Sequence, residues 1–218
     1  MRLKSKSVAG IVCGTFAAGA GAVAAYALFI RPWHLRWGAR EREVEMPLPG
    51  DDFVPDPKCE ATHAVTIKAP VAEVWPWLAQ VGQDRGGFYS YAWLENLFGC
   101  HMRNADRIVP EFQHIEVGGA VRLHPKVPPL PVLVCEPRRA IVLGSNTDDP
   151  GTWGFYLEEV DANTTRLVVR GRGAWHPSLL KSLFYFGVFE PAHFIMERKM
   201  LLGIKERAER TSSINQQR

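Results

Sequence analysis

The sequence predicts an α+β fold in which a curved antiparallel sheet wraps around a long C-terminal helix, preceded by one transmembrane helix. Three observations indicate this arrangement: an N-terminal apolar run without charges, a series of short β-branched segments separated by Gly, Pro and Asn, and a long helical pattern over residues 179–210. A sheet of this kind must cover one face with apolar groups. The last helix is the expected cover.

Residues 1–37 are expected to form a membrane anchor. The run from Val8 to Ile30 has no charged residue, and at about 1.5 Å rise per residue it is long enough to cross a bilayer. Arg31 and Trp33 follow it, which is typical of the border of a membrane span. These features predict a single-pass membrane protein. The alternative is a cleaved signal peptide, because a basic start and an apolar run also suit that description.

Small residues within the apolar run allow two interpretations. Gly10, Gly14 and Ala18 stand four residues apart, and such small residues let two transmembrane helices pack closely in a homodimer. The alternative is that they have no special role, because Gly and Ala are common in membrane anchors. Basic residues on both sides leave the membrane orientation open.

Cys13 lies in the run, and the other three cysteines form no CxxC pair. That odd number favours a reducing compartment, which is compatible with a cytoplasmic domain.

Charge and motifs exclude several classes of function. The chain has 26 Lys and Arg against 23 Asp and Glu, and three of the basic residues precede the apolar run, so the remainder is balanced. A nucleic-acid partner is therefore not expected, because such proteins usually carry a basic stripe. The sequence contains no metal-ligand spacing, P-loop or dinucleotide fingerprint. We expect neither a metal nor a cofactor.

The segments before the central sheet follow from turn residues and apolar spacing. Residues 38–60 are rich in Pro, Gly and Asp, which predicts a linker. The domain is expected over residues 61–210, with a disordered tail at 211–218. Residues 62–68 alternate and predict a strand, and residues 71–81 predict a helix that is kinked or restarted at Pro76. A second helix is expected at residues 88–98.

The rest of the domain is expected to be a run of antiparallel strands and the final helix. The strands are placed at residues 120–123, 132–135, 139–143, 152–160 and 166–172, and the helix is expected to break at Pro191. In the last strand, Arg166 and Arg170 share one face while Leu167 and Val169 share the other. The apolar face is predicted to point inward and the arginines toward solvent.

Several segments, in order, carry a resemblance to a known superfamily: APVAEVWPWLAQVGQDRGGFYSYAWLEN, ADRIVPE, GTWGFYLEEV, TTRLVVRGRG and MERKMLLGIKERAE. Over about residues 60–210 the chain resembles the SRPBCC superfamily, the START-like and polyketide-cyclase-like helix-grip proteins, in a branch with an N-terminal membrane anchor. The resemblance implies a cavity between the sheet and the C-terminal helix. Similar proteins often carry Asp where this chain has Ala92, which removes one candidate catalytic carboxylate.

Candidate ligand-binding residues are those expected to face such a cavity. Tyr91 and Glu95 are four apart on one predicted helix, and they either orient a polar group of a ligand or lie on a solvated face. Apolar residues of that segment, of one strand and of the last helix line the cavity or simply pack the core. The full set is Phe88, Tyr91, Trp93, Glu95, Trp153, Phe155, Leu157, Phe194 and Met200.

Three functions are compatible with these observations. The first is a membrane-tethered binding or carrier protein for a lipid or another hydrophobic small molecule. The second is a polyketide-cyclase- or dehydrase-like enzyme with Glu95, His176 or His193 as general acid or base. The third is a scaffold for a membrane protein, with a filled core and no ligand. An empty apolar cavity of several hundred Å3 would favour the first two over the third.

Overall fold

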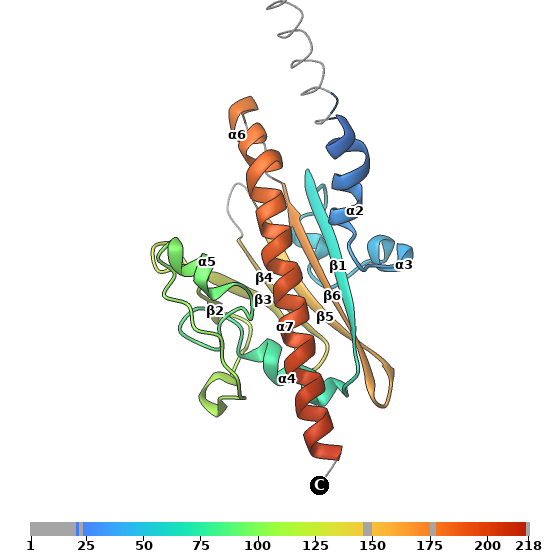
Figure 1. Ribbon diagram of the computed structural model, residues 1–218, viewed down its shortest axis with the longest axis vertical. Helices are drawn as coiled ribbons and strands as arrows, with labels where there is room; N and C mark the ends of the chain where they lie inside the picture. The colour runs from blue at the N-terminus through green and yellow to red at the C-terminus, as the bar shows by residue number, and fades with distance from the viewer. Residues whose placement is uncertain (1–20, 22–23, 146–149, 175–177, 217–218) are drawn as a thin grey trace, which may run out of the picture.

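A six-stranded antiparallel sheet and a long helix dominate the structure, a computed structural model that describes residues 21, 24–145, 150–174 and 178–216 (Figure 1). Helix α7 (Glu190–Gln216) crosses one face of the sheet, whose order is β1-β6-β5-β4-β3-β2. The predicted α+β class is confirmed, and the arrangement fits the helix-grip fold. The strands are β1 (Cys59–Ile67), β2 (Ala120–Val121), β3 (Leu130–Glu136), β4 (Ala140–Ser145), β5 (Gly151–Asp161) and β6 (Thr164–Gly173).

The main core lies between α7 and the sheet. Strand β6 places Leu167 and Val169 in this core, and both are fully buried. Helix α7 contributes Leu201, Ile204 and Ala208, whose spacing keeps them on one face of the helix. Fully burying one such aliphatic side chain contributes about 1.5–3 kcal/mol, so this contact is a large part of what holds helix and sheet together.

The helices that follow β1 differ in part from expectation. Helix α4 (Val71–Ala79) continues through Pro76. Helix α5 (Ala92–Leu97) begins later than the predicted helix at residues 88–98. The reason is Tyr89, whose φ of 57° lies in the left-handed region and is incompatible with a right-handed helix. The side chain of Tyr89 is buried, and its hydroxyl donates to the backbone oxygen of Trp77 at 3.0 Å.

The C-terminal helical segment is continuous across the expected break. Helix α6 (Leu179–Phe184) passes through a π-helical turn, η4 (Tyr185–Phe189), directly into α7. The turn ends just before Pro191, which has no N–H and whose ring crowds the preceding turn, so widening the helix there accommodates the proline. At its other end α7 runs to Gln216. Residues 211–216, expected to be part of a disordered tail, are therefore helical.

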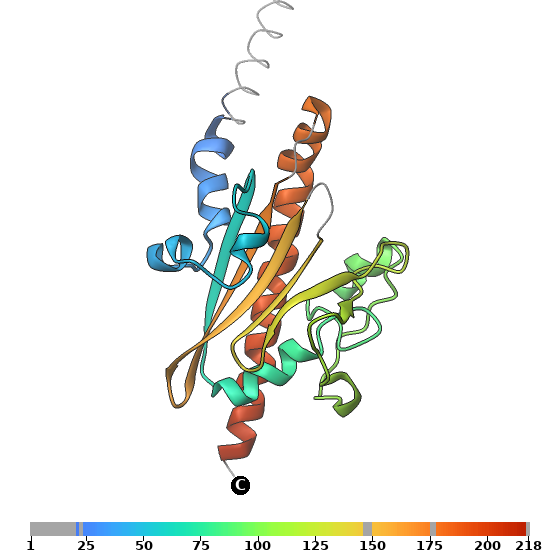
Figure 2. The same ribbon diagram turned by 180° about the vertical axis from the view of Figure 1, so that it is seen from behind.

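Residues 38–57, here called the strap, lie across the face of the sheet opposite α7 (Figure 2). They include a short helix, α3 (Glu41–Glu45), and a 3-10 turn, η2 (Asp51–Phe53). Leu48 of the strap packs against a second, smaller core that includes Val142 and Val168. The hydroxyl of Tyr156 donates to the backbone oxygen of Pro49 at 2.8 Å. The stretch that we expected to be a linker thus covers the second face of the sheet.

Arg166 fastens α3 to the sheet. Its side chain is nearly buried and donates to both carboxylate oxygens of Glu43, at 2.7 and 2.8 Å. It also donates to the backbone oxygen of Gly38 at 2.5 Å and to the hydroxyl of Thr66 at 3.0 Å. A fork-shaped guanidinium suits this bidentate pairing with a carboxylate. Burial alone would raise the pKa of Glu43, but the hydrogen bonds from Arg166 and from the backbone of Arg40 hold it below its usual range.

Arg170 fastens the rest of the strap in the same way. It is 3% exposed and donates to Asp51 Oδ2 at 2.7 Å and to the backbone oxygens of Glu43, Val44 and Met46 at 2.6–3.0 Å. The prediction that the arginines of β6 face solvent is therefore wrong. Alternation along the strand placed them correctly on the face opposite the main core, but the strap brings acceptors onto that face. Buried arginines are stable when paired in this manner.

The N-terminal helical segment lies beside the start of α7. It consists of a π-helical turn, η1 (Tyr26–Ile30), and helix α2 (Arg31–Leu35). Arg31 forms a bidentate ion pair with Glu190, with both distances 2.9 Å. Trp33 packs edge-on against Phe194, with ring centroids 5.6 Å apart. These contacts join the segment to the domain.

The predicted single-pass membrane localisation is corrected by the structure. Within the described ranges of the chain, no helix is long and apolar enough to cross a membrane. Most of the expected span, and with it the proposed dimer face at Gly10, Gly14 and Ala18, lies outside the described residues. The described residues therefore support neither a membrane tether nor a dimer through it.

Candidate functional site

A cavity of about 510 Å3 lies beside α7, between the sheet and the segment that contains α5. Three parts of the chain form its wall: residues 88–130, the strand residue Trp153, and the helical segment from Phe189 to Met200. Most of the side chains are apolar, and the polar ones are few. The lining residues are Phe88, Ser90, Glu95, Cys100, Met102, Leu123, Leu130, Trp153, Phe189, Ala192, His193, Met196, Glu197 and Met200.

The cavity is open at its helical rim. Ala192 and His193 on α7 are exposed to solvent and still line the cavity, as does the half-exposed Phe189. The rings of Phe189 and His193 are stacked, with centroids 5.8 Å apart. Deeper in the wall, Trp153 lies 6.0 Å from Phe88 between ring centroids. An aromatic path therefore leads from the rim into the interior.

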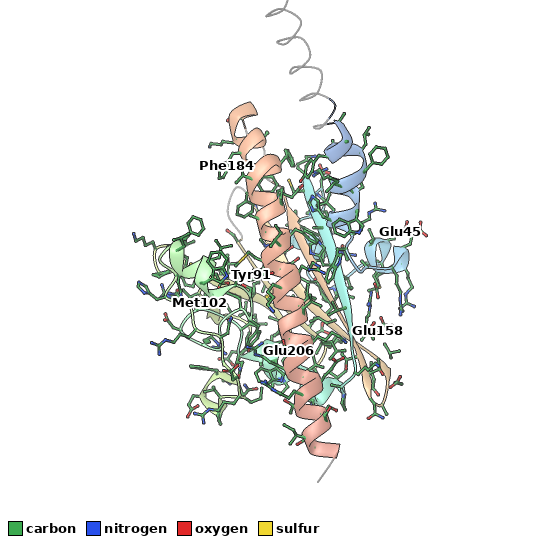
Figure 3. All side chains as sticks on the ribbon, in the orientation of Figure 1. Glu45, Tyr91, Met102, Glu158, Phe184 and Glu206 are labelled. Atoms are coloured by element: carbon green, nitrogen blue, oxygen red, sulfur yellow. The ribbon has the colours of Figure 1, made fainter. Side chains whose placement is uncertain are left out.

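Four of the nine predicted site residues line this cavity: Phe88, Glu95, Trp153 and Met200. Met200 lies on α7, and Phe88 and Glu95 lie on the segment across from it, on the side where Figure 3 labels Met102. The sequence segments that we expected to meet at a cavity are thus brought together. That these four residues contact a ligand remains a prediction.

The other five predicted site residues do not line it. Phe155 and Leu157 are buried in the main core. Phe194 instead lines a smaller neighbouring cavity and packs 5.2 Å from His34 between ring centroids. Tyr91 is the residue before α5, and Trp93 on that helix is 69% exposed. The helix expected to carry Tyr91 and Glu95 as a facing pair begins after Tyr91, so the four-residue spacing does not put them on one helical face.

Glu95 is the polar group of the α5 wall. Its Oε1 accepts a hydrogen bond from the hydroxyl of Ser90 at 2.5 Å. Its Oε2 is buried and has no hydrogen-bond partner among the described residues. Burial raises the pKa of Glu95, and the hydrogen bond from Ser90 offsets only part of that rise. The thiol of Cys100, in the same wall, also has a raised pKa because of burial and the nearby Glu95 charge.

Glu197 is the polar group of the α7 wall, and both of its oxygens are occupied. Oε1 accepts from the indole Nε1 of Trp153 at 2.5 Å. Oε2 contacts Nδ1 of His63, whose Nε2 lies 2.7 Å from the backbone oxygen of His34. Because a carbonyl oxygen only accepts, Nε2 of His63 must carry a proton. Nδ1 and Glu197 then share one further proton.

The pair of His63 and Glu197 is best described as an imidazolium and a carboxylate. Burial alone would lower the pKa of His63, but the Glu197 carboxylate raises it above its ordinary value. Burial alone would raise the pKa of Glu197, but its hydrogen bond with His63 and the nearby His193 lower it. The two charges cancel inside the protein, and the carboxylate also fixes the ring of Trp153 in the cavity wall.

Sequence reasoning missed Glu197, although one signal was present. Glu197 has the same helical spacing as Leu201, Ile204 and Ala208, so it stands on the face of α7 that carries the core. A glutamate on such a face needs a buried partner. His63 occupies an inward position of β1, opposite Val169 of β6. The sequence pattern could therefore have suggested the pair, but not its proximity to a cavity.

A second, smaller cavity of about 190 Å3 lies next to the first and shares Trp153, Phe189 and His193 with it. Its other walls include Cys59 and Glu190. Burial raises the pKa of Cys59, which keeps it a protonated thiol and a poor nucleophile. Within the described ranges no group of three His, Cys, Asp or Glu side chains could hold a metal ion. His176, one of the histidines considered from the sequence, lies outside the described residues.

Comparisons with known proteins find similar solved structures. No family model matches the chain, and no curated protein does. The Zhui aromatase/cyclase of Streptomyces sp. R1128 is 17% identical, over 70% of this chain and 94% of that one, with a TM-score of 0.40. The Aha1 dimer of Colwellia psychrerythraea is 17% identical, over 69% and 96%, with a TM-score of 0.39.

A third similar structure is DynU16, from the dynemicin biosynthetic locus. It is 14% identical, with a TM-score of 0.38, and the alignment covers 66% of this chain. The chain spans 46% of the length of DynU16. The fold assignment rests on the sheet order and on α7, and the function proposed next rests on the cavity.

Proposed function

We propose that this protein binds a hydrophobic small molecule in the cavity beside α7. The observation that supports the proposal is a largely apolar space of about 510 Å3, within the range of about 300–1,000 Å3 that is typical of ligand sites. The space opens to solvent beside Ala192 and His193, so a ligand can reach it. A ligand would replace water against side chains such as Phe88, Met102 and Met200.

The expected affinity follows from the surface that such a ligand buries. A two-ring molecule that buries about 300 Å2 of apolar surface gains roughly 7 kcal/mol at about 25 cal/mol per Å2. Part of this gain is lost to the entropy of association. A gain of about 7 kcal/mol alone would correspond to a dissociation constant of about 10 μM, so with the association cost we expect constants from tens of micromolar to about a millimolar for simple apolar probes, and tighter binding for the natural ligand.

The proposal is tested with the uncharged fluorescent probe N-phenyl-1-naphthylamine and the full chain. We expect a saturable rise in probe fluorescence. Ala192→Trp places a large side chain at the exposed rim and should weaken binding about tenfold or more, because it fills the entrance. Ile195→Trp is the matched control, since Ile195 is an exposed residue of the same helix and does not line the cavity. Absence of saturable binding to the unmodified protein would refute the proposal.

Mass spectrometry identifies the natural ligand. Protein purified without organic solvent and ionised under native conditions should carry a mass increment that is reduced in Ala192→Trp and retained in Ile195→Trp. Dissociation and fragmentation of that increment give the identity of the bound molecule.

A cyclase- or dehydrase-like enzyme is the second candidate. Glu95 and His193, two titratable side chains that line one largely apolar cavity, favour it because a bound substrate would lie next to both. If the cavity performs acid–base chemistry on an aromatic polyketide-like substrate, Glu95→Gln or His193→Ala should lower turnover about 100-fold or more. Unchanged turnover in both folded variants would rule out these roles. An interaction scaffold with a filled core is not favoured, because the interior contains a cavity.

A further inference from the structure

The wall of the cavity lacks positive charge in its interior. None of its described lining residues is a lysine or an arginine. The titratable groups that face the space are Glu95, Cys100, His193 and Glu197. His193 is at the exposed rim and not in the interior, and Cys100 is a thiol with a raised pKa. An anionic ligand would therefore lose its hydration without gaining a counter-charge.

The two carboxyl groups of the wall differ in what they can offer. Both oxygens of Glu197 are engaged by His63 and Trp153, and the imidazolium of His63 compensates its charge. Glu95 has no such cation beside it, and its Oε2 is a buried oxygen without a partner. A buried polar atom in this state normally finds a hydrogen bond. The last torsion of a glutamate is broad, so the carboxyl group of Glu95 can turn to meet a ligand.

We infer that the ligand is an uncharged, largely apolar molecule with a hydroxyl group that hydrogen-bonds to Glu95, and that the cavity rejects organic anions. A hydroxyl suits this position because it can accept from a protonated carboxyl and donate to an ionised one. A carboxylate, sulfonate or phosphate would be repelled by Glu95 when that group is ionised. The inference rests on the proposed function, because it specifies the chemistry of the molecule bound in the same cavity.

Three ligands on one naphthalene frame test the inference by isothermal titration calorimetry at pH 7.5. They are 2-naphthol, which has the hydroxyl, 2-methylnaphthalene, in which a methyl group replaces it, and naphthalene-2-sulfonate, which is anionic at all accessible pH values. For the unmodified protein we expect the sulfonate to bind at least about tenfold more weakly than 2-naphthol, a ratio that corresponds to about 1.4 kcal/mol.

Glu95→Leu removes the hydrogen-bonding group and its charge. The preference for 2-naphthol over 2-methylnaphthalene should fall about tenfold, and the sulfonate should bind more tightly than before. Glu95→Gln is the second variant, for the case in which leucine prevents folding. Glutamine keeps a donor and an acceptor but no charge, so the preference for the hydroxyl should persist while the rejection of the sulfonate weakens. Glu45→Leu, on α3 across the sheet from the cavity, is the matched control and should change nothing (Figure 3).

The outcomes separate this inference from the proposed function. If N-phenyl-1-naphthylamine saturates the protein but the sulfonate binds as tightly as 2-naphthol, the inference is overturned and the proposed function stands. The same conclusion follows if Glu95→Leu leaves the ratio of 2-naphthol to 2-methylnaphthalene unchanged. If the unmodified protein binds neither the fluorescent probe nor any naphthalene, both are overturned.

Discussion

Replacing Arg166 by methionine should be one of the most destabilising single changes in the strap region. Arg166 and Glu43 are both buried, and their bidentate ion pair joins α3 to β6. Methionine fills a similar volume but leaves the Glu43 carboxylate buried without a cation. Removing one partner of a buried ion pair typically costs about 3–5 kcal/mol. Because a domain has only about 5–15 kcal/mol of stability, the variant should be close to unfolding at 37 °C.

A second substitution tests whether the cost comes from the uncompensated charge. In Arg166→Met combined with Glu43→Leu, the buried carboxylate is gone, and well-packed apolar residues often replace a buried ion pair at little cost. The double variant should therefore be more stable than Arg166→Met by about 2 kcal/mol or more. It should not recover fully, since the backbone oxygen of Gly38 and the N–H of Arg40 each lose a side-chain partner.

Urea unfolding of the full chain, followed by far-ultraviolet circular dichroism, measures these free energies. Arg42→Met is the matched control, because Arg42 also joins α3 to the sheet, through Glu158, but the pair is exposed, at 71% and 46% of the two side chains. An exposed pair contributes about 0–1 kcal/mol, so this variant should be nearly neutral. A cost below about 1 kcal/mol for Arg166→Met, with no coupling to Glu43, would refute the account of the strap.

Three further predictions concern pH and helix packing. The pKa of Glu43 is lower in the folded state, so its stabilising contribution is present above its unfolded pKa of about 4.3 and is lost as the pH falls through the folded value. Glu43→Gln should therefore make the free energy of unfolding, measured with urea, depend less on pH in the acid range. The pKa of His63 is raised in the folded state, so its stabilising contribution is complete below about pH 6.5 and is lost as the pH rises through the folded value. Glu197→Gln should lower the midpoint of the His63 imidazole titration measured by NMR, and an unmoved midpoint would contradict the ion pair. Gly203→Ala should lower the free energy of unfolding by about 1–3 kcal/mol, because a Cβ there would collide with the backbone of Tyr89. Gly187→Ala has open space around it and should be neutral or stabilising by up to about 1 kcal/mol. Equal shifts of the thermal unfolding midpoint in the two variants would argue against close packing of Gly203 on Tyr89.

The sheet and its covering helix could be predicted because their signals are local. Alternation in residues 166–172 and helical spacing in residues 179–210 depend only on neighbours in the chain. The strap could not be predicted in this way, because residues 38–60 contain no long periodic segment, and prolines and glycines usually indicate a linker. What orders the strap is a set of contacts between Arg166 or Arg170 and residues more than a hundred positions away.

The cavity was predictable in outline and not in detail. The order of elements indicated that residues near 88–98 and the last helix would face each other. Which side chains line the space depends on where α5 begins, and the left-handed conformation of Tyr89 delays that start. Trp93 is consequently exposed, whereas Glu95 faces the cavity. Leu123 and Leu130 line it from segments that a sequence pattern does not place in space.

The division of the cavity wall has a consequence for how this scaffold could change its ligand. The rigid half comes from α7 and Trp153, whose positions are tied to the core and to the buried pair of Glu197 and His63. The other half comes from the largely irregular excursion between α4 and β3, whose lining residues belong neither to the central helix nor to the ladder of β5 and β6. Mutational libraries confined to that excursion should therefore yield many folded proteins with altered selectivity, whereas libraries on the opposite half should mostly yield unfolded ones.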